Sequence, residues 1–165
     1  TPEEWRQWTD EAERIMRASG DPWETQEVVL QQCRTRLHDG DLPAVPALAA
    51  EAISVPARNG NGPILAEAIM LGAEFAGRCD DSARADELVD LAASVATVIW
   101  NRRWLTLHSP HLVGRLDKSM CHGDPRTDHD IVEHAALAIL TKVVETARPG
   151  RLAGSGLTGR SGTSN

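Results

Sequence analysis

Helix-start signals recur along this chain and constrain its fold more than any other feature. The chain opens with TPEE at 1–4. A threonine can cap the first free N–H groups, a proline suits the first helical position, and a glutamate three residues after the threonine can complete a capping box. DPWE at 21–24 repeats this device, and SPH at 109–111 and TDHD at 127–130 are further starts of the same kind. These signals predict a chain built from helices.

Between these signals the apolar residues follow the spacing of helix faces. Trp5, Trp8, Ala12, Ile15 and Met16 form one stripe, on which we expect Trp5 and Trp8 to be core residues. The apolar stripe within 88–99 is wide, which is typical of a central, mostly buried helix. No segment alternates in the manner of a strand, so we expect no sheet. The predicted fold is all-α, with six or seven antiparallel helices near 2–18, 22–38, 43–57, 63–79, 82–103, 110–121 and 128–147.

Two stretches, 25–58 and 65–98, carry matching small or apolar residues. Cys33, Val45 and Ala52 recur as Ala73, Ala85 and Ala92, with the same spacings of 12 and 7. This arrangement resembles a tetratricopeptide unit, whose small residues let two helices pack closely, and Gly40 and Asp41 stand where that family turns. The offset here is 40 residues, against the family's period of about 34, and the family's large aromatic positions are missing. The resemblance implies a short helical-repeat array; an irregular helical bundle is the alternative.

Composition limits the partners and the compartment. The net charge is −7 and the basic residues are scattered, which argues against nucleic acid and against anionic membrane surfaces. The longest apolar stretch, Leu88 to Trp100, is too short to span a bilayer. Three cysteines do not make a disulfide framework, so we expect reduced thiols and a cytoplasmic protein. Arginine far outnumbers lysine, which suggests a bacterial source. We expect one helical domain over 1–148 and a flexible Gly/Ser/Arg tail over 149–165.

A cluster of histidines and a cysteine is the first candidate site. His and Cys are ligands that Zn²⁺ prefers, and structural sites often bring them in closely spaced pairs. No CxxC or HExxH pattern is present here. The favoured interpretation is that 119–130 ends one helix and caps the next, with no metal bound. The alternative is a metal-binding regulator that uses His108, His111, Cys121, His122 and His129.

Acidic residues on two neighbouring helices are the second candidate. Glu87 and Asp90 are three residues apart and therefore lie on one helix face. Glu67 and Glu74 are seven residues apart and likewise share one face of the preceding helix. Acids on two facing helices resemble the MazG-type nucleotide pyrophosphohydrolases, which implies a Mg²⁺-dependent hydrolase carried by these four residues. The Glu-x-x-Glu pair of that family is missing from 63–79, and Mg²⁺ needs several oxygen ligands in near-octahedral order. A solvated acidic face is the alternative interpretation.

The segment IWNRRW is the third candidate. Trp100 and Trp104 bracket Arg102 and Arg103, and Trp and Arg are enriched at the centres of protein interfaces. The sequence therefore predicts a non-enzymatic protein- or peptide-binding module, or a subunit of a larger assembly formed with a partner or by self-association. It would contact its partner through Arg102, Arg103 and Trp104 and need no cofactor. The Mg²⁺-dependent hydrolase and the Zn²⁺-binding regulator remain the alternatives.

Overall fold

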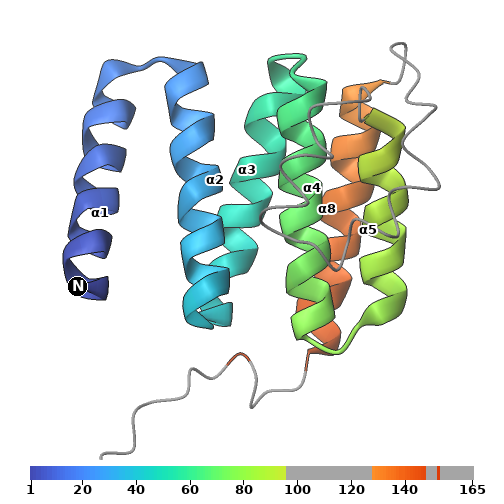
Figure 1. Ribbon diagram of the computed structural model, residues 1–165. Helices are drawn as coiled ribbons and strands as arrows, with labels where there is room; N and C mark the ends of the chain where they lie inside the picture. The colour runs from blue at the N-terminus through green and yellow to red at the C-terminus, as the bar shows by residue number, and fades with distance from the viewer. Residues whose placement is uncertain (96–127, 148–151, 153–165) are drawn as a thin grey trace, which may run out of the picture.

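All regular structure in the described part of the chain is helical. The computed structural model describes residues 1–95, 128–147 and 152. No strand occurs in these residues, which confirms the predicted all-α class. The helices, shown in Figure 1, are α1 (Pro2–Ser19), α2 (Pro22–Asp39), the 3-10 helix η1 (Leu42–Ala44), α3 (Val45–Arg58), α4 (Gly62–Arg78), α5 (Ser82–Val95) and α8 (His129–Thr146).

Most helix starts lie within one residue of their predicted positions. α1 begins with the predicted capping box, in which the Thr1 hydroxyl accepts from the Glu4 N–H and the Glu4 side chain accepts from the Thr1 backbone. The third helix differs, because the chain forms a 3-10 turn before Val45 starts α3. α8 is capped by Asp128, whose carboxylate accepts from the Asp130 N–H at 2.9 Å. The predicted helix at 110–121 lies outside the described residues, as does 82–103 beyond Val95.

The turns of the first five helices recur every twenty residues. The left-handed backbone conformation occurs at Gly20, Gly40 and Gly60, and then at Asp80 with φ 63°. Glycine adopts this conformation without steric cost, whereas a residue with a Cβ is strained there. The hydrogen bonds follow the same interval: the N–H groups of 41, 61 and 81 donate to the carbonyls of 36, 56 and 76 at 2.9, 2.9 and 3.0 Å. These are Schellman-type closures, so α2, α3 and α4 end with the same hydrogen-bond pattern.

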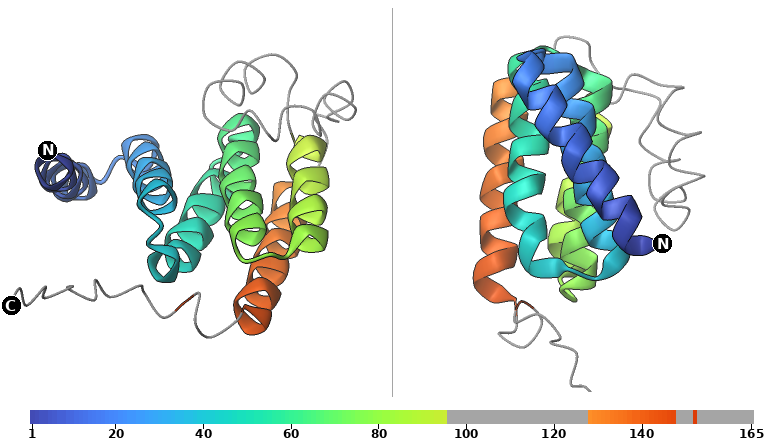
Figure 2. Two further views of the ribbon diagram at one scale, coloured as in Figure 1. Left: turned by 60° about the horizontal axis from the view of Figure 1, so that its bottom comes forward. Right: turned by 90° about the vertical axis from the view of Figure 1, so that its left-hand side faces the viewer.

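α4 is the central helix of the described part. It packs against α2, α3, α5 and α8, and its buried residues lie almost all round the helix. A helix that is apolar on every side belongs in a core. The apolar stripe expected within 88–99 is buried in its described part, at Leu88, Val89, Ala92 and Val95. The helix is not the central one there, however, because α5 packs against α4 and α8 and keeps an exposed acidic edge over 86–90. α8 packs against α3 and α5, although it is distant from both in sequence (Figure 2).

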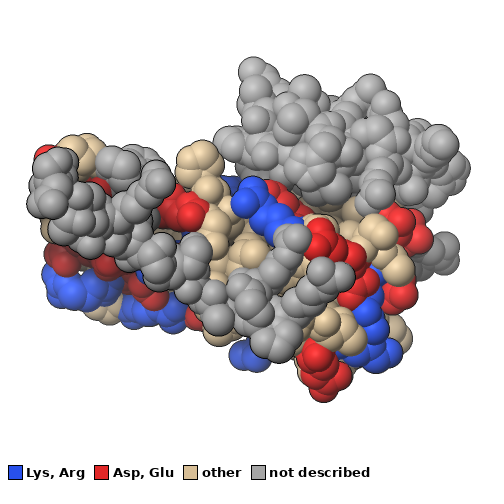
Figure 3. All heavy atoms as spheres, turned by 90° about the horizontal axis from the view of Figure 1, so that it is seen from below, with Lys and Arg blue, Asp and Glu red and all other residues tan. Residues whose placement is uncertain are grey.

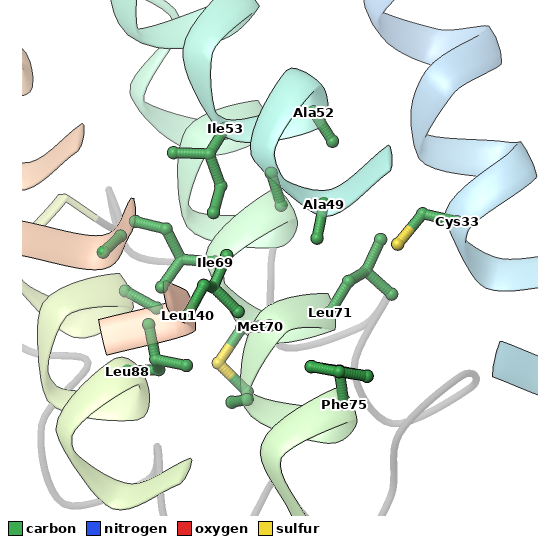
Figure 4. Packing of buried hydrophobic residues seen from close by; sticks show 14 of the residues in the cluster. Cys33, Ala49, Ala52, Ile53, Ile69, Met70, Leu71, Phe75, Leu88 and Leu140 are labelled. Carbon is green, nitrogen blue, oxygen red and sulfur yellow. The ribbon is translucent and has the colours of Figure 1, made fainter. Parts of the chain in front are cut away.

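Small residues let these helices approach closely. In Figure 4 the Cys33 side chain of α2 points toward Ala49 of α3 and Leu71 of α4, and all three are buried. A Cβ built on Gly72 of α4 would lie 3.1 Å from Cδ2 of Leu140 on α8. The helix contacts therefore depend on residues without bulky side chains, as the sequence indicated for Ala52, Ala73, Ala85 and Ala92, all of which are buried.

Candidate functional site

The apolar stripe of α1 is only half covered by the rest of the molecule. Ala12 and Met16, at one edge of the stripe, are partly buried against α2. Trp8 and Ile15, at the other edge, are 73% and 56% exposed. The prediction that Trp8 is a core residue was therefore wrong, because α1 lies at one end of the row of helices and packs mainly on α2 (Figures 1 and 2). The side chain of Trp5 lies outside the described part.

A groove runs between α1 and α2 beside this exposed edge. Its volume is about 290 Å³. The walls mix apolar side chains with a few polar groups, as is usual in sites that bind other molecules. Its lining residues are Thr9, Ala12 and Met16 from α1 and Glu27, Val28 and Gln31 from α2.

Trp23 extends the surface along α2. It is 57% exposed and precedes Glu27 by four residues, so the two side chains lie on one helix face a turn apart. Trp8, Ile15 and Trp23 are three of the four large apolar side chains exposed in the described part; the fourth is Ile131 of α8. We use the name α1–α2 surface for Trp8, Ile15 and Trp23 together with the groove between the two helices.

Polar contacts on other sides of α1 fix it to the rest of the molecule. The Arg17 guanidinium donates to both carboxylate oxygens of Glu51 on α3, at 2.7 and 3.0 Å, and to Glu13 at 2.6 Å. Gln32 of α2 also donates to Glu13. The hydrogen bonds to Glu51 and then to Glu13 raise the pKa of Arg17, so its charge is held firmly. α1 is thus anchored, while its apolar edge stays open.

Acidic residues predominate around the α1–α2 surface. Residues 1–31 contain eight Asp or Glu and three Arg. Arg14 and Arg17 are both engaged in ion pairs, Arg14 with Glu11 and Arg17 with Glu13 and Glu51. Glu24 and Glu27 are exposed, lie three residues apart on α2, and Glu27 lines the groove. On the face seen in Figure 3, acidic and basic side chains are interspersed.

The carboxylates predicted as a Mg²⁺ site serve as separate structural groups. Glu67 of α4 pairs with Arg34 of α2, and Glu74 pairs with Arg78 one turn along α4. Burial raises the pKa of the neighbouring Cys33 thiol to about 12, with Arg34 lowering it and Glu74 raising it further. Cys33 is thus held as a neutral thiol in the core.

The other half of that predicted site points to solvent. Glu87 and Asp90 are exposed on α5. In the described part of the chain, no three His, Cys, Asp or Glu side chains lie together in a way that could hold a metal ion. The structure therefore does not bring Glu67, Glu74, Glu87 and Asp90 together as the pyrophosphohydrolase resemblance required.

Of the predicted His/Cys cluster, His129 alone lies in the described part. It begins α8, and its Nε2 lies 3.4 Å from the position that a Cβ on Gly62 would occupy. His129 is thus a packing neighbour of the start of α4. The predicted ligands His108, His111, Cys121 and His122 lie outside the described residues, as do the predicted partner-binding residues Arg102, Arg103 and Trp104.

Sequence reasoning missed the α2 side of the surface. The core stripe of α2 consists of Val29, Leu30, Cys33 and Leu37, all of which are buried. Trp23 and Val28 do not belong to that stripe. Their positions were the sequence signal for this surface, because large apolar residues outside the core stripe of a helix mark a second contact face.

Within the described residues, no helix has the length and apolar content needed to cross a bilayer. Searches against protein-family models, curated proteins and solved structures found no match to this chain.

Proposed function

We propose that this chain is a protein-binding helical module whose partner docks on the α1–α2 surface. The observation that carries the proposal is the exposure of Trp8, 73% of whose surface is open on an anchored helix. Burying a large apolar side chain fully contributes about 1.5–3 kcal/mol. Trp is also one of the residues enriched at interface hot spots. Trp8, Ile15 and Trp23 can together supply the apolar centre of an interface.

The arrangement of helices supports a repeat-like scaffold for this module. The turns recur at twenty-residue intervals, and their hydrogen bonds recur in the same register. Short connections of this kind favour antiparallel neighbours. Stacked helix pairs use extended surfaces to bind peptides and proteins. A second contact with a partner remains predicted for Arg102, Arg103 and Trp104. A larger assembly would use both this predicted contact and the α1–α2 surface.

Affinity capture with matched variants tests the proposal. Trp8→Ala/Ile15→Ala removes the exposed apolar edge of α1, and Ile131→Ala removes the large apolar side chain that is 67% exposed on α8. We expect wild-type protein and Ile131→Ala to retain the same partner, and the double variant to lose it. Substitutions at exposed positions change stability by about 0.5 kcal/mol or less, so thermal unfolding confirms that the double variant is folded. Retention of the same proteins by all three would contradict the proposal.

A further inference from the structure

We propose that the occupant of the α1–α2 surface is an amphipathic helix that carries Lys or Arg beside its apolar stripe. The proposal rests on the proposed function and specifies the chemistry of the partner. Amphipathic helices commonly bind by laying their apolar side chains into a groove between two helices. Here the groove lies between α1 and α2, and Trp8 and Ile15 continue the apolar surface beyond its edge.

The charges beside the groove select a basic partner. Glu24 and Glu27 lie on α2 one turn apart, and Glu27 lines the groove itself. Glu4 and Glu11 lie on the Trp8 side of α1, since residues three and four apart share a helix face. Arg17 is turned away toward Glu51 of α3. On the α1 side, however, Glu4 is paired with the Thr1 amino group and Glu11 with Arg14. A helix that lies in the groove therefore meets the carboxylates of Glu24 and Glu27 along the α2 edge, and complementary positive charge is favoured there.

The groove lining also suits a helix of varied apolar side chains. Met16 contributes a flexible, polarizable wall that can adapt to side chains of different shape. Thr9 and Gln31 supply polar groups at the same groove, which can orient the incoming helix. Ala12 leaves space between them, so that a side chain of the partner can approach the α1 backbone.

Charge also decides between a foreign helix and a second copy of this chain. Two copies that met through this surface would place acidic residues 1–31 against the same acidic residues. Like charges brought together at an interface are unfavourable. A second copy therefore fits this surface less well than a basic helix does.

The probes are two synthetic helical peptides that share the same pattern of leucines. One carries lysine at every polar position and the other carries glutamate at every polar position. Fluorescence anisotropy with the full chain at low salt measures their binding. We expect the lysine peptide to bind and the glutamate peptide to bind at least about tenfold more weakly. Trp8→Ala/Ile15→Ala should abolish binding of the lysine peptide.

Matched charge variants test whether the carboxylates beside the groove contribute to binding of the lysine peptide. Glu24→Gln/Glu27→Gln should weaken binding of the lysine peptide by about three- to tenfold. Glu87→Gln/Asp90→Asn removes the same charge from an exposed pair of the same spacing on α5, and should leave the affinity unchanged. An equal loss in both variants would show attraction to the overall negative charge and would overturn the inference.

The remaining outcomes separate this inference from the proposed function. If both peptides bind equally and both depend on Trp8 and Ile15, the apolar surface is a docking site but the basic partner is wrong. If the lysine peptide does not bind, the inference is overturned, and the capture experiment still decides the proposed function.

Discussion

Arg17 of α1 and Glu51 of α3 form a two-point ion pair between helices that are not consecutive in the chain. The distances are 2.7 Å from Nη1 to Oε1 and 3.0 Å from Nη2 to Oε2. This pair fastens the end of α1 to the body of the protein, on a side away from the exposed tryptophan.

A double-mutant cycle on this pair should give a measurable coupling. Both side chains are partly exposed, 42% and 35%, so solvent screening limits the coupling energy of Arg17→Ala and Glu51→Ala to about 0.5–1 kcal/mol. Urea unfolding of the four proteins measures it. The Arg14–Glu11 pair within α1 is the control, with a coupling of about 0.3 kcal/mol expected. Equal couplings in the two cycles would show that Arg17 does not anchor α1.

Asp81 should make stability depend on acid pH. Burial raises the pKa of this carboxyl, but hydrogen bonds from Arg84 and Thr146 and the charge of Arg84 outweigh burial and hold the pKa below 3.8. A lowered pKa stabilises the fold above the unfolded value, and this stability is lost as pH falls through the folded value. Asp81→Asn should lower the free energy of unfolding by about 1 kcal/mol at neutral pH. Urea unfolding should show this difference shrinking below pH 3.8; a constant difference would contradict the assignment.

Gly62 and Gly77 should respond in opposite ways to the same substitution. A Cβ on Gly62 would lie 3.1 Å from the Val95 carbonyl oxygen, a backbone atom, whereas a Cβ on Gly77 would meet nothing within 4 Å. Gly62→Ala should destabilise the protein by about 1–3 kcal/mol through overpacking. Gly77→Ala should stabilise α4 by about 0.5–1 kcal/mol through helix propensity. Thermal unfolding measures both, and a Gly62→Ala protein as stable as wild type would refute the close contact.

Cys33 should be inert toward thiol reagents in the folded protein. It is buried, and burial raises the pKa of its thiol to about 12, so the reactive thiolate is scarce at neutral pH. In a Cys79→Ser/Cys121→Ser protein, labelling of Cys33 should be slow in buffer and fast in urea. Fast labelling in buffer would mean that the α2–α3–α4 core opens readily. Circular dichroism of this double variant checks that it is folded.

Local sequence signals were sufficient to place the helices. Capping residues, prolines and apolar spacing act within a few residues, so α2 was expected over 22–38 and spans Pro22–Asp39. Gly40 marked its end because the left-handed turn there, at φ 74°, favours glycine. Neither feature needs knowledge of the rest of the fold.

The functional surface could not be predicted in the same way. The stripe of α1 identifies an apolar face, but whether another helix covers that face is decided by tertiary packing. Trp8 and Met16 belong to one stripe, and only Met16 faces α2. The four carboxylates of the predicted Mg²⁺ site do not converge for a related reason. Glu67 pairs with Arg34 of another helix, and the spacing of residues along α4 does not reveal that pairing.

The even spacing of the turns has a consequence for how such a chain can change in length. Two helices and their two turns occupy forty residues between Gly20 and Gly60, and again between Gly40 and Asp80. Duplication or deletion of one such stretch preserves the twenty-residue spacing of the turns that follow. An insertion of another length preserves this spacing only if it forms a longer loop. We therefore expect natural length variation in chains of this kind to come in forty-residue steps.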